Sequence, residues 1–363
     1  MARRLRRVPM RLLVYEWCSS GGLAAADTPS IVRTGDDVEW LAREGRAMFR
    51  ALVADALRDG GFTVTALVDA ARGCDLPAAA EVVPVRAGAE VDQLVAAARS
   101  AAATIVVAPE TAGVLAARVA AVREGGGHVL GPAVGFVRAA SDKQATIDAL
   151  AAAGIAVPAG RALAAGAAWP DFFRLPAVRK ARASTGADGL VVVRWGEPLP
   201  PPADHPTRLE AWCAGVPVGV ACVLGPAGVL TLPPLVQRFA ARAGAGSVPG
   251  YVGGDLLADP VARPRAEALA ARAVAALLRR DGGSAAAGWV GVDMILGGRA
   301  DGLDDRVLEV NPRPTTSFVG LAAAAAGSLV RLVVDAAAGR PVAYPRFTGS
   351  PSFSLADAPT RPA

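Results

Sequence analysis

The residues best suited to chemistry lie near the C-terminus, within residues 307–317 (VLEVNPRPTTS). The β-branched residues there predict a short strand that ends at two prolines. Side chains two positions apart on a strand face the same way, so Glu309 and Asn311 share one side and Arg313 follows at the strand end. Carboxylate and amide oxygens suit Mg²⁺, and arginine binds phosphate or carboxylate through two hydrogen bonds. The stretch therefore predicts a site for Mg²⁺ and a phosphate group.

A third candidate ligand, Asp293, lies inside the apolar run 288–296 (GWVGVDMIL). The residues GGRADGLDDR between the two runs indicate a turn, so the runs predict a hairpin that brings Asp293 beside Glu309. An acid inside an apolar strand is unfavourable unless it is paired or binds a metal. We therefore expect Asp293, Glu309 and Asn311 to bind Mg²⁺, or Mn²⁺ in its place. The alternative is an edge strand on which Asp293 faces water.

Lysine is scarce in this chain, which contains 38 Lys and Arg residues in total. Only Lys143 and Lys180 are lysines, and Asn311 is the single asparagine. Retention of an ammonium group against such a bias toward arginine indicates that a compact point charge is required, because a planar guanidinium is not its equivalent at a phosphate. Chance survival of the two lysines is the alternative.

Lys143 lies in the first turn of a helix predicted over residues 139–153, with Ser141 as its N-cap. The helix dipole disfavours a cation there by roughly 0.3–1 kcal/mol, which a bound phosphate would offset. A solvated lysine is the alternative. Lys180 ends a predicted strand, and a loop of small residues, 181–189 (ARASTGADG), follows it. Backbone N–H groups of such a loop can bind phosphate, although an ordinary β-turn is the alternative.

Strands and helices alternate through residues 12–137, which predicts a parallel α/β sheet. Ligands bind at the carboxyl ends of such strands, where two loops supply substrate candidates. Residues 237–254 look like irregular chain and supply others, because Gly-rich backbone allows a ligand to approach closely. Ordinary turns and a surface loop are the alternatives. The substrate candidates are Glu16, Gly21, Gly22, Glu110, Tyr251, Gly253 and Gly254.

Composition and charge bound the class of protein. The net charge of +5 and the pI near 9.4 do not by themselves indicate nucleic-acid binding, because the arginines are scattered and not interleaved with aromatic residues. The four cysteines lack metal spacing, so we expect reduced thiols in a cytoplasmic protein. The Ala-rich helix predicted over residues 320–338 is interrupted by Arg331 and Asp335, so we expect no membrane span. A basic nucleic-acid binder is an alternative.

Taken together, these segments resemble the ATP-grasp superfamily of carboxylate–amine ligases. The matching motifs occur in the family's order: Ser141-Asp142-Lys143, Val178-Arg179-Lys180 with residues 184–189 (STGADG), Gly291-Val292-Asp293, and residues 309–313 (EVNPR). Within the superfamily the chain looks most like the tyramine–glutamate ligase group of methanofuran biosynthesis and its bacterial relatives. That closer likeness rests on Val14-Tyr15-Glu16 with Gly21-Gly22, on residues 108–111 (APET) and on residues 251–254 (YVGG).

The resemblance implies roles for individual residues. Arg313 and Lys180 would be catalytic, and Asp293, Glu309 and Asn311 would hold two Mg²⁺ ions. The family usually has Pro at the position of Ala181, Gly at that of Ser184 and an acid near Ala211, so this chain departs from the pattern there. The residues implied to bind ATP are Lys143, Lys180, the loop residues Ser184, Thr185 and Gly186, and a hinge of Glu210, Ala211, Trp212 and Cys213.

The resemblance also implies an α/β protein with the ATP-grasp fold. We expect a parallel α/β domain at 12–137, a small central α+β domain at 138–212 and a C-terminal α+β domain at 213–340. A disordered basic extension (1–11) and a Pro/Ser-rich tail (341–363) would flank them. The implied reaction joins a carboxylate, glutamate, to an amine, tyramine or tyrosine, through an acyl phosphate; a homodimer is possible. The alternatives are an ATP-grasp ligase for another amino-acid pair and an ATP-binding protein without turnover.

Overall fold

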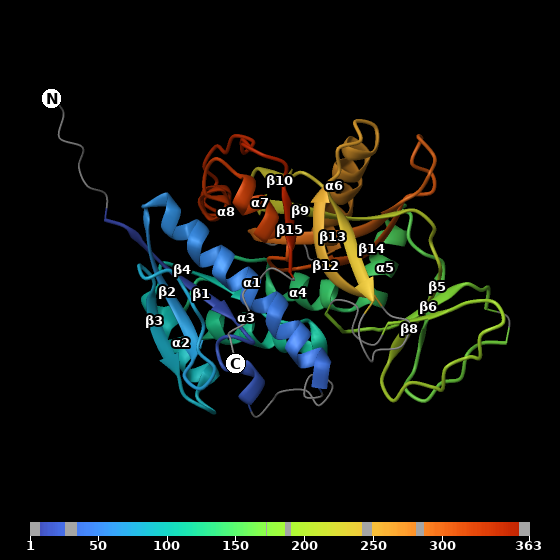
Figure 1. Cartoon of the computed structure of the whole chain (residues 1–363), viewed down its shortest axis with the longest axis horizontal. Coiled ribbons are helices and arrows are strands. Elements are labelled where there is room, and N and C mark those ends of the chain that lie inside the picture. Colours follow the sequence, from blue (N-terminus) through green and yellow to red (C-terminus); the bar gives the residue numbers. More distant parts are fainter. Residues whose placement is uncertain are drawn as a thin grey trace.

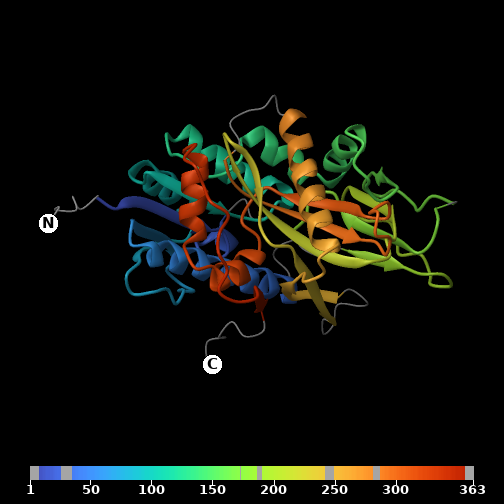
Figure 2. The same cartoon turned by 90° about the horizontal axis from the view of Figure 1, so that it is seen from above.

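The computed structural model describes residues 8–25, 35–171, 173–185, 190–241, 249–280 and 287–355. These residues form three β-sheets with helices packed against them (Figures 1 and 2). The C-terminal sheet lies between the N-terminal sheet and the small central one. Among the described residues, no helix is both long and apolar enough to cross a membrane.

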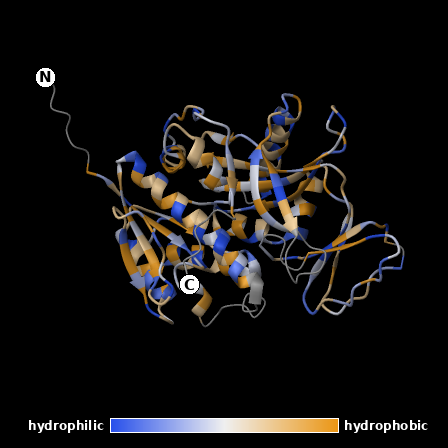
Figure 3. Ribbon diagram, in the orientation of Figure 1, coloured by the Kyte–Doolittle hydropathy of each residue, from blue (hydrophilic) through white to orange (hydrophobic). Residues whose placement is uncertain are grey.

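The N-terminal sheet is parallel, as the alternation of strands and helices predicted. Alternate residues of its strand β1 face opposite sides: Leu12 and Val14 pack in the cluster that contains α1, whereas Leu13 and Tyr15 pack with α2 and α3. Figure 3 shows hydrophilic and hydrophobic residues alternating along α1, as expected for a helix with one buried face. The strand order is β3-β2-β1-β4, with β1 Met10–Glu16, β2 Phe62–Asp69, β3 Glu81–Val85, β4 Ala103–Val107, α1 Gly35–Asp59, α2 Glu90–Ser100, α3 Val114–Glu124 and the 3₁₀ turns η1 Gly22–Ala24 and η3 Thr111–Gly113.

Two helices lead into the central sheet, and the cap between them differs from the prediction. Asp142, not Ser141, caps the second helix: its Oδ1 accepts from the backbone N–H groups of Gln144 at 2.9 Å and Ala145 at 3.2 Å. Ser141 instead ends the first helix, and its hydroxyl donates back to the Val137 carbonyl. The central sheet is antiparallel, in the order β5-β8-β6-β7. The elements are α4 Val134–Ser141, α5 Lys143–Ala152, β5 Gly160–Leu163, β6 Ala177–Ala181, β7 Val191–Val193 and β8 Thr207–Ala211.

The C-terminal sheet is antiparallel, in the order β14-β13-β9-β11-β12-β15, with β10 beside β9. Helix α6 packs on one face of this sheet, and α7 and α8 pack on the other. The elements are β9 Val216–Gly225, β10 Gly228–Thr231, β11 Leu235–Ala241, β12 Pro249–Leu256, α6 Ala262–Arg280, β13 Gly288–Leu296, β14 Arg306–Asn311, α7 Ser317–Ala324, α8 Leu329–Ala337 and β15 Ser352–Ser354.

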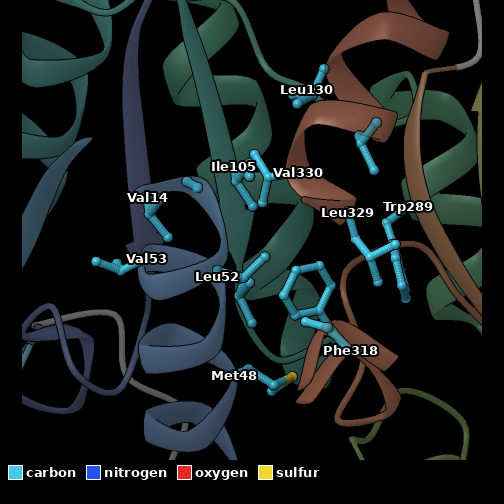
Figure 4. Close-up of a cluster of buried hydrophobic side chains, with 14 of the residues drawn as sticks. Val14, Met48, Leu52, Val53, Ile105, Leu130, Trp289, Phe318, Leu329 and Val330 are labelled. Carbon is cyan, nitrogen blue, oxygen red and sulfur yellow. The ribbon is translucent and has the colours of Figure 1, made fainter. Parts of the chain in front are cut away.

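The N-terminal and C-terminal sheets share one hydrophobic core. Met48 and Leu52 of α1 and Phe318 of α7 lie close together there, with Trp289 of β13 and Leu329 of α8 on the other side of Phe318 (Figure 4). The Trp289 and Phe318 rings meet edge to face, with centroids 5.1 Å apart. Each fully buried large apolar side chain contributes about 1.5–3 kcal/mol. This core fixes α1 and the start of α7 relative to β13, and therefore fixes the chain that joins β14 to α7.

Two predictions about the C-terminal part were wrong. Residues 237–254 are not irregular: β11 and β12 pair in an antiparallel ladder on either side of residues 242–248, which lie outside the described part of the chain. The helix predicted over 320–338 is two helices, because the Ser328 hydroxyl caps α8 by accepting from the Arg331 N–H at 3.0 Å. Within the described part of the tail, β15 pairs with β12 and Phe353 is buried.

Candidate active site

The hairpin of β13 and β14 brings the three predicted ligands together, as expected. Asp293 is the register partner of Glu309, and Gly291 is the partner of Asn311. The register shifts after this pair, since Met294 faces Val307, so Leu308 is an inserted residue in a β-bulge. Asn311 donates from Nδ2 to Asp293 Oδ2 at 2.9 Å. The three side chains thus converge on one face of the hairpin.

Residues of the neighbouring strands complete the surroundings of Asp293. Gln237 of β11 donates from Nε2 to Asp293 Oδ1 at 2.8 Å. Gly219 of β9 lies opposite Asp293 in register, and a Cβ at this position would lie 3.3 Å from Asp293 Oδ1. Glycine therefore leaves the carboxylate space, and Gln237 holds it in place. Gln237 was not among the predicted site residues, because its strand was not recognised.

The two acids of the hairpin have opposite electrostatic environments. Burial raises the pKa of Asp293, and the adjacent negative charge of Glu309 raises it further. Burial also acts to raise the pKa of Glu309, but the ammonium groups of Lys143 and Lys180 hold that pKa below its usual range. Glu309 is therefore the carboxylate that keeps its charge, and the two lysines are the reason.

Both lysines of the chain lie at this site and both are buried. Lys143 Nζ lies 3.1 Å from Glu309 Oε2 and donates to the Ser184 carbonyl at 2.7 Å. Lys180 Nζ lies 2.7 Å from Glu210 Oε1 and 3.4 Å from the Leu308 carbonyl oxygen. The structure thus excludes the solvated alternative for Lys143 and places the loop residue Ser184 beside it.

A cavity of about 180 Å³ is lined by both lysines, by Gln237 and by the three predicted ligands of the hairpin. It lies between the central sheet, which supplies Lys180, and the C-terminal sheet, which supplies the hairpin. Glu44 of α1 and the run Thr315, Thr316, Ser317 also line it, and sequence reasoning missed them. The threonines and serine directly follow Arg313, so their position was a usable signal, whereas nothing local marks Glu44. Other described residues of its lining include Leu190, Phe239, Tyr251 and Leu308.

Arg313 reaches across the cavity wall to the N-terminal sheet. Its Nε donates to Glu110 Oε1 at 2.9 Å and its Nη2 donates to Glu110 Oε2 at 3.0 Å. Thr185, of the loop after β6, donates its hydroxyl to Glu110 Oε2 at 2.7 Å. The structure therefore joins three predicted residues from distant parts of the chain. Glu110 uses both carboxylate oxygens on protein donors.

The predicted hinge begins in the last two residues of β8, Glu210 and Ala211, and continues into Trp212 and Cys213. Glu210 is buried, accepts from Arg208 Nε at 3.0 Å and is the register partner of Val178, which also faces Val192. These residues share the sheet face that carries Lys180. Beyond them, a second hollow is lined by Pro176, Val192, Arg194, Trp195 and Trp212. Trp212 is half exposed there, and the Cys213 thiol donates to the Ala211 carbonyl at 3.7 Å.

Several substrate candidates are not part of the cavity lining. The Glu16 carboxylate accepts from the backbone N–H groups of Cys18 at 3.0 Å and Ser19 at 2.8 Å, so it holds the turn that follows β1. A side chain on Gly22 would overlap the Trp17 indole, and one on Gly253 would overlap the Phe353 carbonyl. Gly21 has φ +92°, and Gly254 lies in β12. Tyr251 does line the cavity, and Gly186 lies outside the described residues.

Two family models match parts of this chain. Residues 140–317 match the family model described as ATP-grasp domain, and residues 63–135 match the pre ATP-grasp 3 domain. Every predicted ATP and metal residue falls within the first match. A search of curated proteins found no match to this chain.

Solved structures with a similar fold cover more than nine-tenths of the chain. A putative ATP-grasp superfamily protein from Archaeoglobus fulgidus has a TM-score of 0.64 at 20% identity, over 93% of this chain and 90% of that one. An N5-carboxyaminoimidazole synthetase from Staphylococcus aureus, complexed with ADP, has a TM-score of 0.62 at 12% identity, over 94% and 81%. An L-amino acid ligase from Bacillus licheniformis has a TM-score of 0.59 at 15% identity, over 91% and 74%.

Proposed function

We propose that this chain, which has the ATP-grasp fold, is an ATP-dependent ligase that joins a carboxylate to an amine. The observation that carries the proposal is the single cavity in which Asp293, Glu309 and Asn311 face Lys143 and Lys180. Paired acids opposite paired ammonium groups suit a triphosphate with its cations. The cavity lies between the central and the C-terminal sheet, where residues of both can contact one ligand.

The donor set at the hairpin fits Mg²⁺. This ion takes hard oxygen ligands, commonly one or two carboxylates with phosphate oxygens and water. Among the described residues, no three His, Cys, Asp or Glu side chains cluster to hold a metal, which agrees with a site that relies on Asn311 and on oxygens of the nucleotide. Asp293, Glu309 and Asn311 would hold two Mg²⁺ ions, or Mn²⁺ in their place. The ions would neutralise charge on the phosphates.

The residues of this chain would then position the reactants. When a cation binds, the Glu309 carboxylate would contact the cation instead of Lys143. The Lys143 ammonium could then bind a phosphate oxygen. Phosphoryl transfer needs chiefly positioning and charge neutralisation, which Lys143, Lys180 and Arg313 can supply. A substrate carboxylate oxygen would attack the γ-phosphorus and release ADP. An amine would then attack the acyl carbon, lose a proton and displace phosphate, so the protein itself need supply no nucleophile.

The central sheet is the proposed site of the adenine. Val178, Val192 and Glu210 share the face that carries Lys180, and the chain leaves β8 at Ala211 and Trp212. Apolar side chains there suit a flat base, and the backbone of residues 210–213 offers polar groups to its edge. Ser184, Thr185 and Gly186 would lie over the phosphates, as the position of Ser184 beside Lys143 supports.

The substrates we propose are glutamate, as the carboxylate, with tyramine or tyrosine as the amine, in a methanofuran-type pathway in the cytoplasm. This choice rests on the likeness of Glu16, Glu110 and the Tyr251 segment to the tyramine–glutamate ligase group. A different amino-acid pair is the second candidate, favoured by the structural likeness to an L-amino acid ligase. Both candidates share the same phosphoryl chemistry.

The test is release of ADP from Mg·ATP in the presence of glutamate and a panel of amines that includes tyramine and tyrosine. We expect ADP release to depend on one amine and to accompany a new amide mass. If no carboxylate and amine pair produces an amide while calorimetry shows Mg·ATP bound, the chain binds ATP without turnover. If Mg·ATP does not bind, the proposed function is wrong.

A further inference from the structure

Glu110 lies on a turn with an unusual backbone. The turn follows β4, and Ala112 within it has φ 50° and ψ 23°. Among the described residues, Ala112 is the one non-glycine with positive φ, and Gly113 follows it with φ 77°. Residues in this region persist where the surrounding contacts hold them, and they concentrate at functional sites. Glu110 directly precedes this turn and is only 3% exposed, so the turn holds a buried carboxylate in a fixed position.

Glu110 makes contacts with two different parts of the ATP-grasp site. Arg313 grips both of its carboxylate oxygens, at 2.9 and 3.0 Å, although the two residues are 203 positions apart. Thr185 contacts it twice: the Thr185 hydroxyl donates to Oε2 at 2.7 Å and accepts from the Glu110 backbone N–H at 2.9 Å. The N-terminal sheet thus holds Arg313 and the loop after β6 through one residue.

The bidentate pair with Glu110 also determines which N–H groups of Arg313 remain for a ligand. A guanidinium carries five N–H groups. Glu110 takes two of them, and the Pro314 carbonyl accepts a third from Nη1 at 3.2 Å. Within the described part of the chain the other two N–H groups, one on Nη1 and one on Nη2, have no protein acceptor, and Arg313 lines the cavity. They suit an oxyanion, either a carboxylate or a phosphoryl group.

We propose that Glu110 is a positioning residue for the site. It fixes the guanidinium of Arg313 so that its remaining N–H groups serve an oxyanion in the cavity, and it anchors the loop after β6 through Thr185. This inference rests on the proposed nucleotide site but not on amide formation. It assigns Glu110 a part in ATP binding rather than a direct contact with the amine or carboxylate substrate.

The test uses the full chain with Glu110→Gln, Thr185→Val and the double variant. Thr185→Val keeps the shape of the side chain and removes only the hydroxyl. We expect each single variant to weaken Mg·ATP binding, measured by calorimetry, by about tenfold, as for loss of one hydrogen bond to a charged group. The double variant should bind no more than about twofold more weakly than Glu110→Gln, because the Thr185 hydroxyl acts through Glu110, whose carboxylate Glu110→Gln already removes. Backbone amides of residues 181–185 should exchange hydrogen faster in both single variants.

A matched control separates positioning from simple stability. Glu90 and Arg118 form another buried bidentate pair within the N-terminal part, at 2.8 Å. Glu90→Gln should lower the melting temperature but leave exchange at residues 181–185 and Mg·ATP affinity as in wild type. Asp59→Asn, which removes the Asp59–Arg331 pair between α1 and α8, is a second control.

Two outcomes would overturn the proposal. One is hydrogen exchange at the backbone amides of residues 181–185 that is as slow in Thr185→Val as in wild type. This result would overturn the proposal even if Glu110→Gln does not fold. The other is a loss of Mg·ATP affinity in Glu90→Gln as large as in Glu110→Gln. The exchange measurement needs no ligand, so it tests the anchoring by Glu110 even if the chain proves not to be a ligase.

Discussion

Lys143 and Glu309 form an ion pair across the cavity, with Nζ 3.1 Å from Oε2, although the residues come from α5 and from β14. Their side chains are only 6% and 16% exposed. A buried pair of this kind is costly to break by removing one partner, because the other charge is left without compensation. The pair therefore links Lys143, the lysine that we propose binds phosphate, to the proposed metal ligand Glu309, and each can be tested through the other.

Glu309→Gln should nearly abolish turnover. The substitution removes a charged ligand proposed for the metal and the negative charge paired with Lys143, while preserving the shape of the side chain. We expect ADP release to fall by about 100-fold or more, with weakened binding of Mg·ATP. Asp301→Asn, on the exposed turn of the same hairpin, is the control and should retain wild-type activity. Wild-type ADP release by Glu309→Gln would dismiss the metal site.

Lys180→Arg should fail to replace the lysine. The ammonium lies 2.7 Å from Glu210 in a buried position, and a planar guanidinium requires more space and a different geometry. We expect Mg·ATP affinity, measured by calorimetry, to fall by about tenfold or more. Arg161→Lys on β5, an exposed position of the same sheet, supplies the matched control. Unchanged affinity in Lys180→Arg would show that any cation suffices there.

Asp142→Ala should destabilise the protein by about 1 kcal/mol, because Asp142 caps α5. Burial acts to raise the pKa of Asp142, but hydrogen bonds from Arg182 and from backbone N–H groups hold it below its usual value. A lowered pKa contributes stability that is complete above the unfolded value, about 3.9, and is lost as the pH falls through the folded value.

Urea unfolding at several pH values measures this effect. The difference in unfolding free energy between wild type and Asp142→Ala should be constant above about pH 5 and should shrink toward pH 3. Ser141→Ala is the control for the cap that the sequence suggested, and we expect a smaller effect. If Ser141→Ala is the more damaging change, the assignment of the cap is wrong.

Gly22→Ala distinguishes a structural from a substrate role for the turn after β1. The added methyl group would meet the buried Trp17 indole, so the protein should lose about 1–3 kcal/mol of stability. Denaturant unfolding measures the loss, and Gly298→Ala, where a Cβ meets no atom within 4 Å, is the control. A variant that is as stable as wild type but has lost ligase activity would instead support the substrate role.

The elements that were predicted well depend on local patterns. The sequence predicted strands at 288–296 and from Val307 on, joined by a turn, and Asp293 faces Glu309 as expected. The parallel N-terminal sheet was predicted from the alternation of strands and helices along residues 12–137. β11 and β12 were missed because polar residues and glycines interrupt the alternation of apolar and polar residues that predicts a strand. Gln237, for example, faces the cavity and not a hydrophobic core. The single helix predicted over 320–338 is divided by a cap at Ser328 that the Ala-rich pattern hides.

Local patterns specify the types and order of the chemical groups: two lysines, the hairpin acids, Asn311 and Arg313 all lie at or beside one cavity. Their partners depend on how distant parts of the chain pack. Glu110 and Arg313 are 203 residues apart, and no periodic pattern encodes which carboxylate will meet which guanidinium. This pair depends on how the N-terminal and C-terminal sheets pack, which is set by the core shared between α1, α7 and β13. The strands and the turn of the hairpin depend on residues close together in the sequence, whereas the geometry of the site depends on how the sheets pack.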